Sequence, residues 1–435
     1  MTVEMKSKPL LEVPRKSPAR LFLDLYQAGS GFRGFVDFAV IGGIVLAFIH
    51  GLQPFATGFR LSGSGTATAP PSVQTQKMDT GDIVKIGLRN NLLAPRLSEL
   101  GLDETNFDGV PQPLRLQLVT AWRLYRDKKP VEAVELLRDA PDDPHVLLVR
   151  GLATIAQPYN GAFRSGVAMI EKAAQQSDPK ALAVMGVMHI AGVPGLDRDL
   201  EKGQRFLQQA AAAGDADASR IVGQGFLSGW MGSIDPARAA RYFRFAMDKG
   251  DAKSTFRLAD MTLQGNGVKK DEVEADRLAE KAALQGNREA QAFVGGRKLM
   301  PYLAGLTDHA EDALKWLNMA ADQNEPIAMR FLANFYHSQG ARTGEVNLAR
   351  GNELLKRCVD KTADSGCAFD YGEAINAGVA EPRDVKKAYA LFMLANRDGR
   401  NRAAATKLEQ IAKELTKTDI VNAQMIASEL SVSKE

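Results

Sequence analysis

The sequence predicts an all-α protein in which helical hairpins repeat along the chain and stack into a right-handed α-solenoid. Two observations support this fold class: a small residue recurs at a nearly constant interval, and the residues around each copy have the 3.6-residue apolar period of an amphipathic helix. The intervals are 35, 37, 36, 36, 38 and 39 residues. The seven marker residues are Gly151, Gly186, Gly223, Ala259, Gly295, Ala333 and Gly372.

One segment, LQGNGVKKDEVEADRLAEKAALQGNREA at 263–290, shows how a hairpin is built. Its Gly265 and Gly267 have the spacing of a phosphate-binding loop, but such a loop follows a strand and contains a third glycine shortly afterwards. The preceding residues, KSTFRLADMTLQ, have a helical period instead. We therefore expect the two glycines to end one helix, and a second helix to follow and stop at Gly286.

Each hairpin has the residues that close helix packing requires. Ala181, Met185, Gly186 and His189 fall on one helical face, and the same arrangement recurs in later copies. The second helix carries an Ala-Ala stripe, as at 210–211. Because a single pair buries little apolar surface, stability must come from stacking on neighbouring pairs.

Helical patterns also flank the repeats. Residues 112–152 predict a related helical pair that ends at the PDDP turn, and residues 403–430 predict two more helices, the second capped by Thr418. We place an N-terminal helical, TPR-like region at 78–144, the repeats at 145–402 and C-terminal capping helices at 403–435.

The repeats resemble the Sel-like repeat family, which is related to the tetratricopeptide repeat. One copy matches the family pattern at Leu258, Gly265, Gly267, Val268, Asp271, Ala275, Lys281, Ala282, Ala283 and Gly286. Another matches it at Ala313, Trp316, Leu317, Ala320 and Ala321. The first and sixth copies lack the G-x-G turn, and Pro301 replaces a turn glycine in the fifth. The resemblance implies a protein-binding α-solenoid of a bacterial, membrane-anchored type.

An uncharged span precedes the repeats. Residues 38–59, FAVIGGIVLAFIHGLQPFATGF, contain no Asp, Glu, Lys or Arg, and 22 helical residues reach roughly 33 Å, enough to cross a bilayer core. We expect one transmembrane anchor at 36–59. A cleaved signal peptide with a small-x-small site at Ala67-Thr68-Ala69 and a buried soluble helix are the alternatives.

The flanks of this span predict its orientation. Residues 1–35 contain six basic and three acidic residues, which favours a cytoplasmic N-terminus. Residues 60–77 form a Gly/Ser/Thr/Pro-rich tether. The repeats would then lie in the periplasm, with the protein held in the inner membrane. Ala39, Gly43 and Ala47 recur every four residues, which suggests a weak homodimer through this face of the span.

Composition argues against nucleic acid as a partner. Residues 36–435 contain 49 basic and 49 acidic residues, and the charges are interleaved rather than gathered in a basic stripe. The five histidines are scattered, with no metal-ligand spacing, and no serine lies in a nucleophile turn. We expect a non-enzyme with no cofactor and no metal site. The alternative, suggested by the resemblance, is a β-lactam- or peptidoglycan-acting hydrolase.

A binding surface is expected on the concave side, which the first helices would line. The residues three before and one after each marker are not needed for packing within a hairpin, so we expect them to be exposed to a protein partner. The candidates are Arg220, Gln224, Phe256, Asp260, Arg330, Asn334, Phe369 and Glu373.

The chain has two cysteines, Cys358 and Cys367. Each occupies a small-residue position of a helix, so both can be small buried side chains. The resemblance to secreted cysteine-rich members of the same family implies a disulfide across this helix junction. Together these features favour a membrane-anchored envelope scaffold that binds proteins, with a regulator of a sensor or envelope enzyme as the alternative.

Overall fold

The computed structural model describes residues 99–431, apart from residues 102, 108, 158–160, 194–195, 308, 344–346 and 380. Throughout this part the chain is helical, and its only extended pairing is an isolated bridge between Val193 and Leu196. No helix within it is long and apolar enough to cross a membrane. The basic segment 1–35, the span predicted at 36–59, the tether at 60–77 and residues 78–98 lie outside the described residues.

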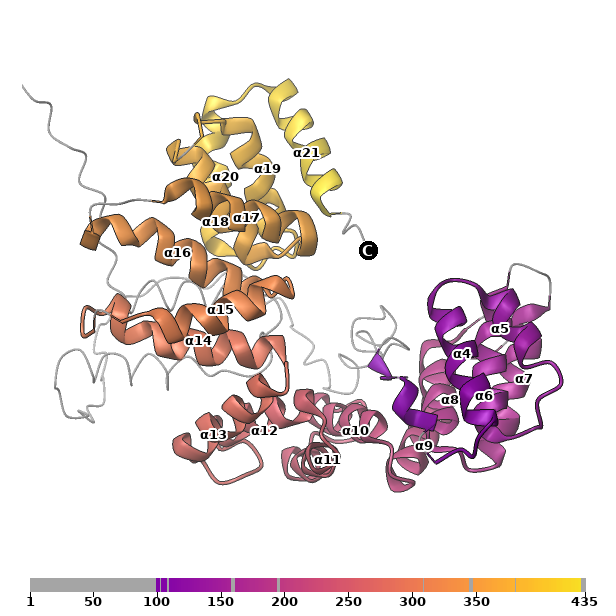
Figure 1. The fold of residues 1–435 in the computed structure, drawn as a ribbon. Coiled ribbons are helices and arrows are strands. Elements are labelled where there is room, and N and C mark those ends of the chain that lie inside the picture. Colours follow the sequence, from indigo (N-terminus) through magenta and orange to yellow (C-terminus); the bar gives the residue numbers. More distant parts are fainter. Residues whose placement is uncertain are drawn as a thin grey trace, which may run out of the picture. The chain divides into compact units, whose positions relative to one another are not determined.

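The described residues divide into two compact units, which are described separately: one ends at Ala282 and the other begins at Ala283. The helices of the first unit, coloured indigo to rose in Figure 1, are η2 (Glu104–Phe107), α4 (Leu114–Arg126), α5 (Pro130–Leu136), α6 (Pro144–Ile155), α7 (Ala162–Gln175), α8 (Pro179–Ala191), α9 (Leu200–Ala212), α10 (Ala216–Ser228), α11 (Pro236–Asp248), α12 (Ala252–Gln264) and α13 (Glu272–Leu284). The last two residues of α13 fall beyond the boundary between the units.

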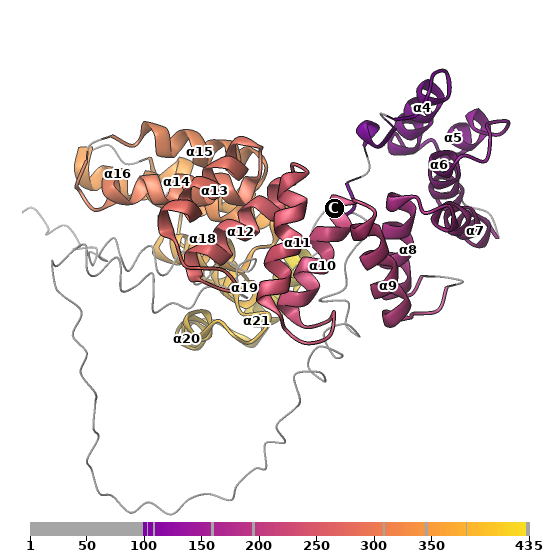
Figure 2. The ribbon, with the colours of Figure 1, turned by 90° about the horizontal axis from the view of Figure 1, so that it is seen from below.

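The second unit contains α14 (Arg288–Leu303), α15 (Glu311–Asp322), α16 (Pro326–Thr343), α17 (Leu348–Thr362), α18 (Ser365–Ala377), α19 (Val385–Ala395), α20 (Arg402–Ile411), η3 (Ala412–Glu414) and α21 (Lys417–Ser431). Helices α14, α15 and α16 pack on one another, and they lie side by side in both Figure 1 and Figure 2. Helix α19 contacts α18, α20 and α21, so the two C-terminal helices pack on the last hairpin.

The marker residues bring the two helices of each hairpin together. A Cβ atom placed on Gly151 would lie 2.7 Å from Ile170 Cγ1, and one placed on Gly186 would lie 2.7 Å from Leu207 Cγ. Real Cβ atoms do not approach other atoms so closely, and the contacting residue is on the second helix of the same hairpin. The predicted role of the small residue is confirmed.

Aspartates and asparagines cap the helices at regular positions. The side chains of Asp178, Asp215 and Asp251 accept hydrogen bonds from the backbone N–H three residues ahead, at the start of α8, α10 and α12. Second helices are capped in the same way, for example by Asp199 at α9 and Asp235 at α11. Since the first N–H groups of a helix have no intrahelical partner, these caps define where each of these hairpins turns.

The G-x-G turn between α12 and α13 has the conformation that the sequence predicts. Gly265 and Gly267 both have positive φ, 75° and 71°, and Gly265 terminates α12. A Cβ on Gly267 would lie 2.3 Å from the backbone carbon of Pro236, at the start of α11. This glycine is therefore required both by its backbone conformation and by the close approach of the preceding hairpin.

Two predicted helix ends were wrong. Pro301 does not replace a turn residue but lies inside α14, which continues to Leu303, and the turn falls at Gly305, with φ of 74°. Helix α21 is capped by Thr416 rather than Thr418: the Thr416 hydroxyl accepts from the Asp419 N–H at 3.1 Å and donates to the Asp419 carboxylate at 2.7 Å. The reciprocal bonding with Asp419 selects the earlier threonine.

Candidate functional site

A line of buried and half-buried charges connects the first helices of successive repeats. Its members, which we call the charged ladder, are Lys180, Asp215, Asp217, Arg220 and Asp251. The ammonium of Lys180 on α8 lies 2.7 Å from Asp215 and 2.8 Å from Asp217. Arg220 on α10 lies 3.3 Å from Asp217 and 3.6 Å from Asp251, the cap of α12. The caps of consecutive repeats are thereby tied to each other.

The surroundings of Lys180 and Asp217 favour their charged forms. Burial alone would lower the pKa of Lys180, but the carboxylates of Asp215 and Asp217 outweigh it and raise this pKa. Burial would likewise raise the pKa of Asp217, and Lys180, followed by Arg220, instead lowers it. Lys180 and Asp217 thus each stabilise the ionised form of the other.

A short segment from before α4 lies against this ladder. We call Glu99–Gly101 the strap; it belongs to the indigo part of the chain that precedes α4 in Figure 1. Arg220 donates a hydrogen bond to the Glu99 carbonyl and lies 3.3 Å from the Glu99 carboxylate. The Gly101 N–H donates to Asp217 at 2.8 Å. Leu100, between them, is only 5% exposed, so the strap is held by both its backbone and an apolar side chain.

The chain that follows the strap continues along the first helices of the unit. Glu104 receives two hydrogen bonds of 2.7 Å from Arg123 on α4. Phe107 is 1% exposed, and its ring meets that of His145 on α6 edge to face, with centroids 6.2 Å apart. The strap and its continuation therefore contact α10, α6 and α4, although they precede all three in the sequence.

The predicted exposed surface was wrong for half of its residues. Arg220, Phe256, Asp260 and Arg330 are at most 8% exposed. A first helix packs against its own second helix, the preceding second helix and another first helix, as α8 does with α9, α7 and α6. Eleven of the 13 residues of α8 are consequently buried. The prediction considered only contacts within one hairpin, whereas stacking on neighbouring hairpins buries these side chains as well.

The buried members of that set have structural partners. Arg330, which is 1% exposed, pairs with Asp370 of α18 at 2.7 Å, and Asp260 accepts from Gln264 at 2.6 Å. Phe369 is half-buried and its ring lies 5.6 Å from that of Phe392. Glu373 is 38% exposed and pairs with Lys407 at 2.9 Å.

Half-buried Gln224 and Asn334 remain as candidates whose side chains are partly open to a partner. The eight predicted residues belong to two separate units and do not form one described site: Gln224 and Phe256 belong to the first, whereas Asn334 and Glu373 belong to the second.

Another buried carboxylate lies at the start of α16. Glu325 is 5% exposed, and burial, reinforced by the nearby charge of Glu289, raises its pKa to about 7. Arg288 lies 3.2 Å away and opposes the shift, but its side chain is half exposed and compensates only in part. Glu325 therefore changes its charge near neutral pH, unlike an ordinary surface glutamate.

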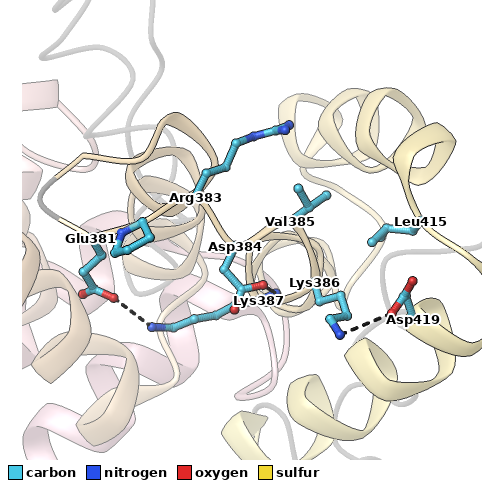
Figure 3. Close-up of a pocket in the computed structure, with 9 residues that line it drawn as sticks. Glu381, Arg383, Asp384, Val385, Lys386, Lys387, Leu415 and Asp419 are labelled. Atoms are coloured by element: carbon cyan, nitrogen blue, oxygen red, sulfur yellow. Dashed lines mark hydrogen bonds and ion pairs between the residues drawn. The ribbon is translucent and has the colours of Figure 1, made fainter.

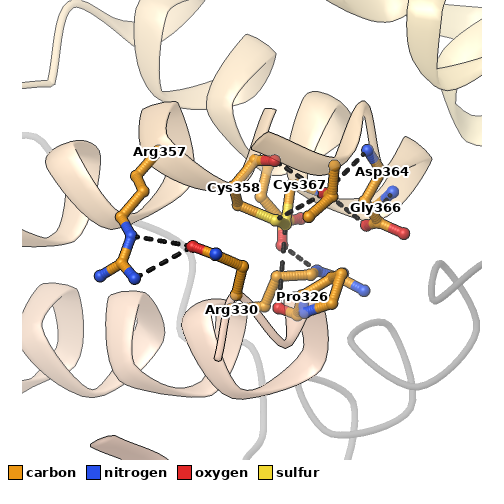
Figure 4. The surroundings of a disulfide bond; sticks show 10 residues. Pro326, Arg330, Arg357, Cys358, Asp364, Gly366 and Cys367 are labelled. Carbon is orange, nitrogen blue, oxygen red and sulfur yellow. Dashed lines mark hydrogen bonds and ion pairs between the residues drawn. A yellow bond between two sulfur atoms is a disulfide. The ribbon is translucent and has the colours of Figure 1, made fainter. Parts of the chain in front are cut away.

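The structure joins Cys358 and Cys367 in a disulfide between the end of α17 and the start of α18, with Cα atoms 6.0 Å apart. Figure 4 shows its surroundings, where Asp364 caps α18 by accepting from the Gly366 and Cys367 N–H groups. The two sulfurs and the Asp364 carboxylate are the one group of possible metal ligands in the described part of the chain. As a disulfide, the cysteines offer no thiolate to a metal.

A cavity of about 680 Å³ lies beside the start of α19. Figure 3 shows Lys387 pointing toward Glu381 and Lys386 toward Asp419, ion pairs of 3.4 and 3.3 Å. Arg383 pairs with Glu414 outside the view, at 2.8 Å. Three cations therefore have carboxylate partners within the protein, and none of the three is left uncompensated for an incoming ligand.

Sequence reasoning missed the ladder and the strap. The signal for the ladder was present in the aspartates that precede α8, α10 and α12, since Asp178, Asp215 and Asp251 recur with the period of the repeat. Basic residues follow them within one or two turns. For the strap there was no such signal, because its partners lie 116 and 121 residues away in the sequence.

Comparison with known proteins agrees with this architecture. The Sel1 repeat matches residues 179–215, 216–251, 252–287, 288–325 and 365–399. A relative from Schizosaccharomyces pombe, chitin synthase regulatory factor 4, is 25% identical over an alignment of 203 residues that covers 43% of this chain and 31% of that protein. The alignment thus spans about a third of the relative's length.

Solved structures include a Sel1 repeat protein from Oxalobacter formigenes, with a TM-score of 0.49, 20% identity and coverage of 55% of this chain and 95% of that one. A protective antigen of uropathogenic Escherichia coli, displaying an SLR fold, gives a TM-score of 0.42 at 16% identity and covers 82% of this chain and 95% of its own.

The stacked hairpins define a helical-repeat protein of the tetratricopeptide-like class. The marker residues, the G-x-G turn and the five matched copies identify the repeat itself. Residues 179–325 and 365–399 are Sel1 repeats. The unmatched copy at 326–364 still folds as a hairpin, with α16 packed on α17, because its apolar positions are retained although its turn is not.

Proposed function

We propose that this protein is a membrane-anchored scaffold of the cell envelope that binds other proteins through the first helices of its repeats. The observation that carries the proposal is the charged ladder with the strap on it: the first-helix surface holds a stretch of polypeptide by its backbone. Sel1 repeats are protein-interaction modules, and here the buried charges hold the first helices in fixed register. A rigid surface of this kind loses little entropy on binding.

The membrane anchor is proposed from the uncharged residues 38–59 and from the basic flank before them. A cytoplasmic N-terminus and a periplasmic repeat domain follow from that orientation. The disulfide between Cys358 and Cys367 supports an oxidising compartment, since such bonds are rare in the cytosol.

The span itself is proposed to associate weakly with a second copy through Ala39, Gly43 and Ala47. Replacing Gly43 with leucine is expected to lower self-association in a membrane two-hybrid assay. An unchanged signal in that assay would exclude this face as the contact.

A regulatory binder of an envelope sensor or enzyme is the second candidate. The similarity to a chitin synthase regulatory factor favours it, because regulation by a repeat protein is itself a binding function. The two candidates differ in whether the captured partner changes its activity upon binding.

Photo-crosslinking in the native cell tests the proposal. A photoreactive residue at Gln224 or Asn334, both half-buried on first helices, is expected to capture a specific protein in the membrane fraction. The same residue at exposed Arg205, on the second helix α9, is the matched control. Capture at Arg205 but at neither first-helix position would contradict the proposed surface.

A further inference from the structure

The strap binds as an extended peptide would bind. Arg220 donates a hydrogen bond to the carbonyl of Glu99, and Asp217 accepts one from the N–H of Gly101. Two backbone groups that are two residues apart thus contact neighbouring side chains of α10. Leu100 is buried between them. These contacts use the groups that every polypeptide has, plus a single apolar anchor.

We propose that the strap occupies a peptide-binding site in cis, and that this site accepts an extended acidic–apolar–small segment of a partner protein. The acidic position corresponds to Glu99, whose carboxylate is 3.3 Å from Arg220. The apolar position corresponds to Leu100. A Cβ on Gly101 would lie 3.3 Å from Asp217, so the third position favours glycine or another small residue.

The site does not depend on the strap for its own charge pairing. When the strap dissociates, Asp217 retains its ion pair with Lys180, and Arg220 retains its ion pairs with Asp217 and Asp251. The strap adds only a third partner to each group. Its departure therefore opens the site without leaving an unpaired buried charge, the event that makes breaking such a network costly.

The inference deepens the proposed function by naming the kind of segment that the first-helix surface recognises, and it rests on that function. A segment attached to the same chain acts at a high effective concentration, so it competes with any partner segment in trans. The strap consequently sets a threshold: a partner binds only when its segment outcompetes Glu99–Gly101. Apparent affinity is reduced by the fraction of molecules in which the site is open.

Peptide binding to the full-length protein in detergent tests this proposal. The probe is a fluorescent peptide with the sequence of residues 97–105, LSELGLDET, followed by anisotropy. Two variants release the strap: Glu99→Arg, which faces Arg220 with a like charge, and Leu100→Asp, which removes the apolar anchor. Asp139→Arg, at an exposed position away from the ladder, is the matched charge-reversal control.

Both strap variants are expected to bind the peptide roughly tenfold or more tightly than wild type or Asp139→Arg. A peptide with aspartate in place of the leucine that corresponds to Leu100, LSEDGLDET, is expected not to bind. Adding Asp217→Asn to Glu99→Arg is expected to weaken binding, because the amide loses the charge that accepts the peptide N–H.

Equal affinity in wild type and both strap variants would overturn the proposal. So would loss of helical circular dichroism in both strap variants, because the strap would then be a structural element and not a displaceable ligand. The proposed scaffold function has its own readout: crosslinked partner capture at Gln224 or Asn334 with no peptide binding would leave the scaffold standing and remove only the cis-ligand inference.

Discussion

The ammonium of Lys180 lies 2.7 Å from the carboxylate of Asp215, the residue that caps the first helix of the next repeat. The Asp215 side chain thus has two roles: it accepts a hydrogen bond from a backbone N–H at the start of α10, and it forms an ion pair with Lys180 of α8. Stacking in this protein is specified by polar contacts as well as by apolar burial.

Replacing Lys180 with alanine is expected to destabilise the first unit by about 3 kcal/mol, because the buried carboxylate of Asp215 would lose its cation and half-buried Asp217 would keep only Arg220. Urea unfolding followed by circular dichroism measures the effect. The control is Arg277→Ala, which removes an exposed i,i+3 pair with Glu274 and is expected to leave the unfolding midpoint unchanged. Equal midpoints for both variants would show that the ladder contributes no stability.

Glu325 is expected to make stability depend on pH. Its pKa is about 7 in the folded protein and its ordinary value is 4.5, so between these values the folded state binds more protons than the unfolded state. The contribution of Glu325 is therefore fully present below pH 4.5 and is lost as pH rises through 7, by about 3 kcal/mol in total.

Glu325→Gln tests this pH dependence, because glutamine has no proton to lose. The variant is expected to match wild type near pH 4.5 and to be more stable than wild type above pH 7. The exposed Glu353→Gln on α17 serves as the control and should follow the wild-type profile. A constant difference in stability between wild type and Glu325→Gln from pH 4.5 to 8 would refute the assignment.

Gly267→Ala is expected to destabilise the turn more than Gly250→Ala does. Both glycines have positive φ, 71° and 90°, so each substitution incurs a conformational cost of about 1 kcal/mol. Only Gly267 has the backbone of Pro236 where the new Cβ would be, whereas nothing lies within 4 Å of that position at Gly250. Similar thermal midpoints for the two variants would argue against this close approach.

Cys358 and Cys367 are expected to be bonded in protein isolated from the cell envelope. Alkylation without reduction should add no mass, and alkylation after reduction should add two labels. Reduction should lower stability by about 2 kcal/mol, since the bond restricts the unfolded chain. Two freely alkylated thiols in unreduced protein would disprove the bond.

A reporter fused after Glu435 is expected to be active only outside the cytoplasm, with the full-length protein in the membrane fraction. The 22 uncharged residues at 38–59 and the basic residues before them give the reason. A shortened chain that begins after residue 60 is the control and should lose membrane association. Full-length protein that is soluble without detergent would contradict the proposed anchor.

Most of the fold could be predicted from local patterns. The marker residues and the Ala-Ala stripes allow the two helices of a hairpin to pack closely, and the Gly265–Gly267 turn joins them. The marker residues recur at a nearly constant interval along the chain. Helix ends were harder to predict where two nearby residues could both cap the helix. Thr416 and Thr418 both have the side chain of a helix cap, and only the bond pattern with Asp419 distinguishes them.

The candidate site depended on contacts that no local pattern contains. Arg220 and Arg330 lie on first helices where a single hairpin would expose them, yet stacking buries both. Charge reversal at either position would therefore disturb folding as well as binding, because it would leave unpaired charges in the interior. Gln224, Asn334 and Glu373, which stay half-buried, are the better positions for surface variants.

The sequence by itself determined the repeat, its period and the small residues that let helices pair, because these follow from steric rules acting within about 40 residues. Only the tertiary structure decided which polar residues become buried partners. Lys180 meets the cap of the next repeat, and Glu99–Gly101 meets Asp217 and Arg220, which lie 116 and 121 residues further along the chain from their partners. The physical reason is that burial and charge pairing depend on contacts between stacked repeats, whereas helices and turns form from residues within a single repeat.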